Sequence, residues 1–400
     1  MATYYVDPQN LTTNASDSVG GGTSPSSPYL TLSYCFGDIN VTHGIGTPAG
    51  DVIKMIGVYA PDDTECNSLT SNVVTYTSGN SVGVTIISDG ATAFGTASPT
   101  SRATMSQANC TLRIINSTVA QYVTIDGFTC TGFLAGEYMF QLGQYARFQN
   151  CYCDMTAQTS NPKLFAGRNY YTVDSCYIKA LRTTGSGGAL LGIFTGSNTS
   201  NNFVEIDDST TSGGALTSHL QGSNSGNSYI GNFVWLKRGA GFLSSNSTGI
   251  QVIGNTVVGD SKVYQYGTQI WINAGSYLVK NNHFENLHQV VGYLSNGTTG
   301  GAHGIQMYGN TFYNCNYTTS VDPSWTRNDP TRISIRHTAR NVTLASSGVV
   351  DAANGDLRPS TARRGTNAIN GTMDLSQAWI DAQANGAGGN SSVQQYKPFG

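Results

Sequence analysis

Three carboxylates and one arginine in the middle of this chain could together perform acid–base chemistry. They are Arg147, Asp174, Glu205 and Asp207. If these residues project from neighbouring turns of a repeating backbone, equivalent positions would lie about 5 Å apart. That spacing suits a Ca²⁺ ion held by carboxylate oxygens beside an arginine base, which is the chemistry of an elimination reaction on a polysaccharide. It equally suits the close carboxylate pair of a retaining glycosidase.

The four residues also have a simpler interpretation as surface charge. A repeating surface needs some charged groups for solubility, and an aspartate at a strand end can cap its own turn. Two tyrosines predicted on the same face, Tyr229 and Tyr308, could stack on sugar rings, but the chain has 22 tyrosines and such placements are common. No cofactor is predicted, apart from Ca²⁺ under the elimination chemistry.

The elements that would position these residues are indicated by a repeat of eight residues. Each strong copy has apolar residues at its first, third and eighth places and an asparagine at its sixth, as in IQVIGNTV (250–257), YLVKNNHF (277–284) and IQMYGNTF (305–312). Weaker copies are read upstream at 123–130, 146–153, 171–178, 204–211 and 228–235. Successive copies start 22 to 33 residues apart, which is enough for three short strands with their turns. This period predicts the coils of a parallel β-solenoid.

Stacked coils place equivalent residues in columns. The asparagines Asn255, Asn282 and Asn310 are therefore predicted to form a buried ladder, in which each side-chain amide bonds its neighbour and nearby backbone groups. Beside the ladder the frame predicts apolar core columns, which include Ile206 and Ile230 with Val252, and Trp235 with Val257.

Four cysteines occupy inward places of the same frame, namely Cys130, Cys151, Cys153 and Cys176. They are predicted to be reduced and buried, because a free cysteine packs as a small hydrophobe. Eight cysteines in 400 residues do not make a disulfide scaffold, and no second pair of ligands stands at zinc spacing. Reduced thiols agree with synthesis in a cytosol.

The composition restricts the classes of partner. Charged residues make up 11% of the chain and the formal net charge is −3, so no overall field favours nucleic acid or an anionic membrane. No apolar run reaches the ~18 residues of a membrane helix. The opening MATYYVDPQN has neither the basic nor the apolar region of a signal peptide. We therefore expect no nucleic-acid partner, no membrane span and synthesis in a host cytoplasm.

Stretches at both ends of the chain carry a family resemblance. These are YYVDPQN, PAGDVIKMIGVYA and VGVTIISDG near the N-terminus, and DAANGDLRPSTARRGTNAING near the C-terminus. They resemble the cap, first coils and closing coil of right-handed parallel β-helix proteins of the pectate-lyase-like superfamily, although TNAI stands where that group usually has SPAI. The resemblance implies an all-β, right-handed parallel β-helix. Its expected parts are an N-terminal cap with the first strands at 1–70, coils at 71–345, and a closing coil with an irregular tail at 346–400.

Within that superfamily, chains low in charge and without a signal peptide look most like phage virion proteins. The resemblance therefore implies a structural virion surface protein, a capsid decoration or fibre-like component, which forms homotrimers and contacts other capsid or tail proteins. Because the caps of a solenoid are individual and its sides repetitive, attachment is expected through Tyr4, Tyr5, Pro25 and Tyr29, or through the tail after Asp374.

The alternative function is enzymatic. The resemblance is also compatible with a tailspike-type polysaccharide lyase or glycoside hydrolase, which would act on a host surface glycan through the four residues named first. The structural hypothesis predicts a location in the virion, and an extracellular location is the alternative.

Overall fold

The computed structural model describes the chain in ranges separated by gaps. These are residues 2–18, 21–43, 50–61, 83–106, 112–114, 122–132, 138–157, 163–166, 169–182, 191–193, 196–208, 217–218, 220–222, 226–238, 240–245, 249–260, 266–270, 276–287, 289–293, 303–315, 333–339 and 341–361. Strands dominate these ranges, with one α-helix, α1 (Leu32–His43), and one 3-10 turn, η2 (Ala352–Asn354). Of the helical segments described, none has the length and apolarity to cross a membrane.

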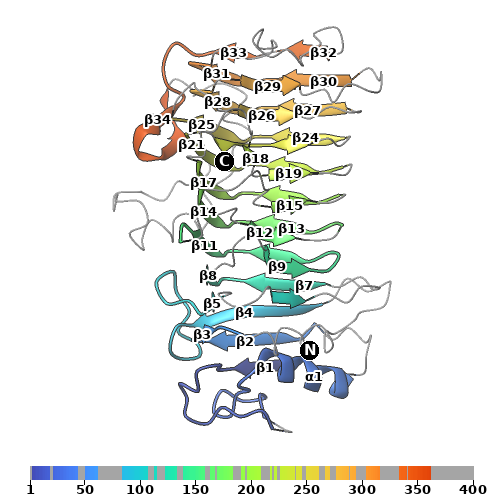
Figure 1. Ribbon diagram of the computed structural model, residues 1–400, viewed down its shortest axis with the longest axis vertical. Coiled ribbons are helices and arrows are strands. Elements are labelled where there is room, and N and C mark those ends of the chain that lie inside the picture. Colours follow the sequence, from blue (N-terminus) through green and yellow to red (C-terminus); the bar gives the residue numbers. More distant parts are fainter. Residues whose placement is uncertain are drawn as a thin grey trace. The chain divides into compact units, whose positions relative to one another are not determined.

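The chain divides into two compact units. The first holds mainly Met1–Gln158 and Pro162–Tyr177, and the second mainly Ile178–Ser376. In each unit every coil contributes strands to parallel rows, so the predicted all-β parallel solenoid is confirmed (Figure 1).

The first unit contains three rows of parallel strands. One row pairs, in order, β1 (Thr3–Val6), β2 (Val52–Ile56), β4 (Val84–Gly90), β7 (Val123–Asp126), β10 (Arg147–Gln149) and β13 (Thr172–Asp174). The next row pairs β3 (Val58–Tyr59), β5 (Thr104–Ser106), β8 (Thr129–Thr131) and β11 (Tyr152–Met155). The third row pairs β6 (Leu112–Ile114), β9 (Tyr138–Leu142) and β12 (Lys163–Ala166).

The second unit repeats this plan after β14 (Tyr177–Arg182). One row pairs β16 (Asn198–Ser200), β20 (Ser228–Ile230), β24 (Ile250–Ile253), β27 (Ser276–Lys280), β30 (His303–Tyr308) and β32 (Ile333–Ala339). The next pairs β17 (Phe203–Asp208), β21 (Phe233–Arg238), β25 (Thr256–Gly259), β28 (His283–Glu285), β31 (Thr311–Tyr313) and β33 (Val342–Thr343). The third contains β15 (Leu191–Ile193), β18 (Thr217–Ser218), β19 (Leu220–Gly222), β22 (Ala240–Gly241), β23 (Ser244–Ser245), β26 (Tyr266–Ile270) and β29 (Gln289–Tyr293).

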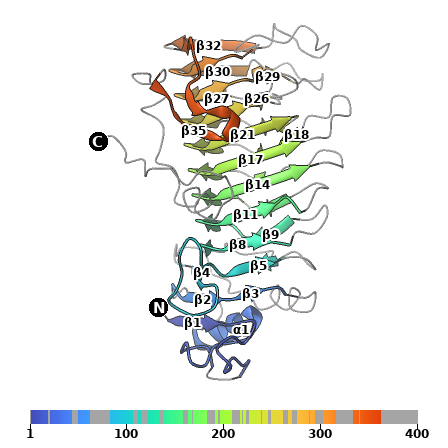
Figure 2. The same cartoon turned by 90° about the vertical axis from the view of Figure 1, so that its left-hand side faces the viewer.

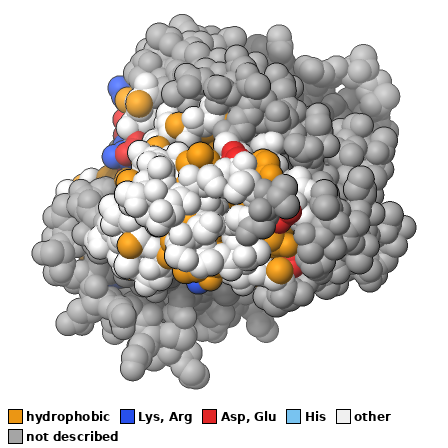
Figure 3. Space-filling model, turned by 90° about the horizontal axis from the view of Figure 1, so that it is seen from below, with side chains coloured by type: hydrophobic (Ala, Val, Ile, Leu, Met, Phe, Trp, Pro, Cys, Tyr) orange, Lys and Arg blue, Asp and Glu red, His pale blue; other side chains and the backbone are white. Residues whose placement is uncertain are grey.

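An N-terminal segment formed by β1, α1 and the loop between them, here called the cap, belongs to the first unit. Tyr29 is fully buried in it, and its hydroxyl donates a hydrogen bond to Asp38 Oδ2 at 2.7 Å. Gly22 has a φ of +71°, and a Cβ at this position would lie 2.0 Å from Tyr29 Cε2, so the loop requires glycine there. Seen from this end, the described surface shows few charged side chains and scattered hydrophobic ones (Figure 3).

The predicted asparagine ladder is confirmed in the second unit, and it is longer than the sequence indicates. Its members are Asn202, Asn232, Asn255, Asn282, Asn310 and Asn341. The first five are fully buried. From the second member onward, each Oδ1 accepts bonds of 2.8 to 3.1 Å from the backbone N–H and the side-chain amide of the preceding member. Each Nδ2 of those members also donates to a backbone carbonyl oxygen, which keeps the buried amides satisfied.

The ladder corrects the position of two weaker copies of the repeat. The copies that contain ladder asparagines are 197–204 and 227–234, whereas the sequence pattern predicts 204–211 and 228–235. The first prediction lies seven residues too far along the chain and the second one residue too far. Apolar and polar residues alternate after the bend as well as before it, so the apolar pattern alone does not show which strand precedes the bend.

A one-residue error exchanges the two faces of a strand. Tyr229 pairs with Val252, and Val234 pairs with Val257, so Tyr229 and Val234 occupy the two core columns. The columns predicted with Ile206, Ile230 and Trp235 are therefore wrong.

The four cysteines predicted in the core of the first unit are buried and free. Cys153 pairs directly with Cys130 on the adjacent strand. Burial raises the thiol pKa of Cys130 and Cys176 well above the usual value. Their reactive thiolate forms are therefore scarce near neutral pH.

We expect a thiol reagent to label Cys315, which is only partly buried, long before it labels Cys130, Cys153 or Cys176. Peptide mass spectrometry after a timed reaction, with and without denaturant, measures this difference. Denaturant should make all four thiols react at similar rates. Fast labelling of the three core thiols in the native protein, or a disulfide between Cys130 and Cys153, would contradict the core assignment.

Candidate functional site

Arg147 and Asp174 lie on the outward side of the first unit but in different columns. Arg147 is exposed and stands in register with Thr172, whereas Asp174 stands in register with Gln149. Asp174 Oδ2 accepts a hydrogen bond from the hydroxyl of the next residue, Ser175, at 3.1 Å. This contact is local to the turn that follows β13.

The column of Asp174 continues to Gln149 and Asp126 through the strand register. Both carboxylate oxygens of Asp126 are engaged, because they accept from Gln149 Nε2 at 2.9 Å and from Asn150 Nδ2 at 2.8 Å. This part of the surface is a fixed polar network made of side-chain carboxylates and amides.

Glu205 and Asp207 lie on β17, the strand that follows the Asn202 bend. Glu205 is 7% exposed and its Oε1 accepts from Lys237 Nζ at 2.7 Å. The same ammonium group lies 3.7 Å from the centre of the Trp235 ring, a cation–π contact. Glu205 is thus one half of a shielded ion pair.

Asp207 is paired in the same way with Arg238, whose Nε donates to its carboxylate. This hydrogen bond raises the pKa of the Arg238 guanidinium. The Arg238 backbone N–H also donates to the carboxylate of Asp260, at 3.1 Å to each oxygen. Asp207 therefore belongs to a surface chain of alternating charges.

The structure does not place the four predicted residues in one column. In the corrected repeat the place equivalent to Asp174 is taken by Ser200, and Glu205 and Asp207 fall after the bend instead of before it. Tyr229, predicted to face outward, is fully buried. A Ca²⁺ ion does not fit Glu205 and Asp207, because a cationic side chain already occupies each carboxylate. Across the described ranges no group of three or more His, Cys, Asp or Glu side chains is arranged to hold a metal.

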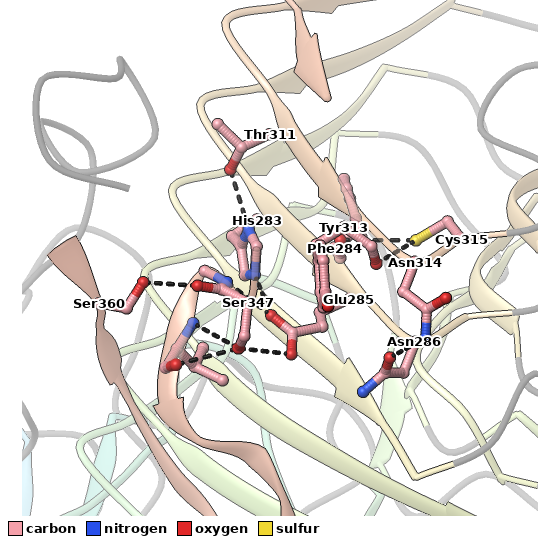
Figure 4. Close-up of polar contacts among 12 residues, drawn as sticks. His283, Phe284, Glu285, Asn286, Thr311, Tyr313, Asn314, Cys315, Ser347 and Ser360 are labelled. Atoms are coloured by element: carbon pink, nitrogen blue, oxygen red, sulfur yellow. Dashed lines mark hydrogen bonds and ion pairs between the residues drawn. The ribbon is translucent and has the colours of Figure 1, made fainter. Parts of the chain in front are cut away.

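A buried polar cluster that the sequence did not indicate lies in the second unit (Figure 4). His283 Nε2 is 3.0 Å from Glu285 Oε2, and His283 Nδ1 is 2.9 Å from Thr311 Oγ1. Glu285 also accepts from Ser347 Oγ at 2.7 Å and from the Gly348 backbone N–H at 2.9 Å. The carboxylate thus receives partners from a segment about sixty residues further along the chain.

The order hydroxyl, imidazole, carboxylate in this cluster has the connectivity of a nucleophilic triad. His283 is 0% exposed, and Glu285 and Thr311 are each 1% exposed, so no substrate atom can reach the hydroxyl in this conformation. The cluster instead fastens a C-terminal hairpin to strand β28. We define this hairpin as residues 345–360, with β34 (Val349–Asp351), η2 and β35 (Asp356–Pro359). Figure 2 shows the hairpin, labelled at β35, beside β21.

Two glycines let the C-terminal hairpin touch the sheet. A Cβ on Gly348 would lie 2.1 Å from His283 Cε1, and a Cβ on Gly355 would lie 2.6 Å from Trp235 Cζ3. Gly355 also has a φ of +76°, which disfavours any other residue. The serines and glycine of 346–348 have the composition of an ordinary turn. The sequence of this segment therefore does not predict that it docks on β28.

Comparison with known proteins gives similarity in fold. No protein-family model and no curated protein matches the chain. Among solved structures, a rhamnogalacturonan lyase is 14% identical with a TM-score of 0.37, covering 78% of this chain and 74% of its own. A family 6 polysaccharide lyase from Pseudopedobacter saltans is 12% identical with a TM-score of 0.38, covering 82% and 96%. A mannuronic-acid-specific family 6 lyase from human gut microbiota is 10% identical with a TM-score of 0.38, covering 81% and 83%.

Proposed function

We propose that this chain is a structural surface protein, of the virion-exterior kind that its sequence resembles, and that it does not cleave glycans. The observation that carries the proposal is the state of the predicted catalytic carboxylates. Glu205 and Asp207 are each held by a basic side chain of the neighbouring strand. A retaining glycosidase needs one carboxyl group as a proton donor and one as a nucleophile, and two ion-paired carboxylates on one strand supply neither.

The interior supports the same proposal. A continuous ladder of buried amides fixes each bend of the second unit to the next, and such a fully satisfied polar network rigidifies a core. Rigidity along repeated coils is a requirement of a permanent exterior component, whereas an enzyme of this fold would need an accessible acid–base pair.

Attachment to neighbours is part of the proposal. Tyr4 and Tyr29, two of the predicted contact residues, are buried within the first unit, so they support the cap instead of touching a partner. Pro25 is exposed on the cap loop and remains a proposed contact. We propose association as a homotrimer, which light scattering of the purified chain measures directly; a monomeric mass would contradict it.

Incubation with a panel of neutral and acidic polysaccharides tests the absence of cleavage. We expect neither unsaturated products, which absorb in the ultraviolet, nor new reducing ends. The variants Glu205→Gln and Asp207→Asn should behave as the wild type. Cleavage that Glu205→Gln or Asp207→Asn abolishes would establish the tailspike-type enzyme and overturn the structural proposal.

A further inference from the structure

A column of three stacked tyrosines stands on the surface of the first unit. The ring centres of Tyr122 and Tyr145 are 4.9 Å apart and those of Tyr145 and Tyr170 are 5.1 Å apart, with planes inclined by 13° and 11°. Tyr145 is 39% exposed and Tyr170 is 46% exposed. Because the rings cover one another's faces, the column presents mainly ring edges and hydroxyl groups to solvent.

These tyrosines occupy a backbone conformation that disfavours them. Tyr145 has a φ of +57° and Tyr170 a φ of +62°, in the left-handed region that bulky residues rarely adopt. Each directly precedes the first place of a repeat copy, and in the second unit the same place is taken by Gly196, Gly226 and Gly249, with φ values of 70°, 80° and 69°. Glycine adopts this bend without strain. The bend therefore strains tyrosine at 145 and 170 where glycine would not be strained, and the stacking of the rings offsets part of that cost.

Charged and polar groups of both signs adjoin the column. Arg147 follows Tyr145 by two residues, and its side chain is exposed. The neighbouring column holds the Asp126–Gln149 network and Asp174. The face thus offers hydroxyl and guanidinium donors, carboxylate and amide acceptors, and an aromatic border.

We propose that this tyrosine face, defined as Tyr122, Tyr145, Tyr170, Arg147, Gln149 and Asp174, binds a neutral glycan. A sugar ring carries hydroxyls around its edge, which match the tyrosine hydroxyls, the guanidinium donors and the carboxylate and amide acceptors of this face, and its C–H groups can pack against the exposed ring edges. Arg147 stands near two aspartates, Asp174 of the face and Asp126 of the adjoining network, so there is no excess of positive charge and the face does not favour a polyanion such as nucleic acid or a polyuronate.

The proposal adds binding to the structural function and does not depend on it. A surface protein that holds a glycan without cutting it would show binding in the array described next and no products in the polysaccharide panel above. Failure of one assay therefore leaves the other interpretable.

A glycan array carrying immobilised neutral chains (glucans, mannans, galactans and xylans) beside polyuronates tests the tyrosine face. We expect the wild type to bind at least one neutral chain. The double variant Tyr145→Gly and Tyr170→Gly should weaken that binding by about tenfold or more, as expected for loss of aromatic contacts. Arg147→Gln should weaken it by a smaller factor. Lys280→Gln, which removes an exposed charge in the second unit, is the matched control and should change nothing.

The double glycine variant should fold, because glycine occupies the same bend in the second unit. If its melting temperature falls, the pair Tyr145→Asn and Tyr170→Asn replaces it, since asparagine also tolerates this conformation. Binding confined to polyuronates, no binding to any neutral chain, or equal binding by the tyrosine variants and the wild type would each overturn the proposal.

Discussion

Replacing Asn282 with leucine should lower the free energy of unfolding of the second unit by about 3–5 kcal/mol, because two buried N–H donors lose the oxygen that they share. Asn282 Oδ1 accepts from the backbone N–H of Asn255 at 2.8 Å and from its Nδ2 at 2.9 Å. Asn282 Nδ2 donates to the Val252 carbonyl oxygen at 2.8 Å. Leucine is similar in size but replaces none of these bonds, and the site is closed to water.

Denaturant titration followed by circular dichroism measures the loss for Asn282→Leu. The matched control is Asn314→Gly, since Asn314 is exposed, has a φ of +53° that glycine adopts without strain, and bonds Asn286 at 2.6 Å on the surface. That control should cost no more than about 1 kcal/mol, because water replaces the lost bond. Equal losses for the two variants would show that the buried ladder does not stabilise the coils.

Replacing Glu285 with alanine should cost about 3–5 kcal/mol and release the C-terminal hairpin, because one member of a buried polar pair is removed and its partners stay behind. His283 Nε2, Ser347 Oγ and the Gly348 N–H all lose the same acceptor group. Because the hairpin loses these bonds to strand β28, its local unfolding should become frequent while the ladder persists.

Limited proteolysis with mass mapping measures the release, and cuts within 345–360 should appear much faster in Glu285→Ala than in the wild type. Glu285→Gln is the control, because its carbonyl oxygen still accepts from one of the two hairpin donors and its size is unchanged. A smaller effect is expected for it. Cutting of the hairpin at wild-type rates in Glu285→Ala would mean that apolar packing alone holds it.

The tyrosine column could have been predicted from the sequence, because a tyrosine precedes three successive copies of the repeat. Tyr122, Tyr145 and Tyr170 each stand immediately before the first place of a repeat copy. The frame counted only the inward places, since they define a core. Extending it by one residue would have aligned the three rings, although the left-handed bend that exposes two of them is visible only in the backbone.

The ion pairs of Glu205 and Asp207 could not be derived in the same way. Their partners Lys237 and Arg238 lie 32 and 31 residues away, and the length of each coil varies with its loops. A shift of one residue moves a side chain to the other face, so the partner of a surface charge depends on a register that only the stacked backbone fixes.

The sequence by itself determined the repeating part of this protein: the all-β parallel solenoid, the asparagine ladder and the buried cysteines. Those features recur at a spacing set by the geometry of one coil, and each coil packs on the next. The same residue pattern therefore appears in the sequence several times and can be recognised there. Only the tertiary structure decided the contacts that do not repeat from coil to coil. One is the pairing of Glu205 with Lys237. The other is the docking of the C-terminal hairpin through His283, Glu285 and Ser347. A single long-range contact leaves no period in the sequence, because its energy comes from groups that meet only after the coils have stacked.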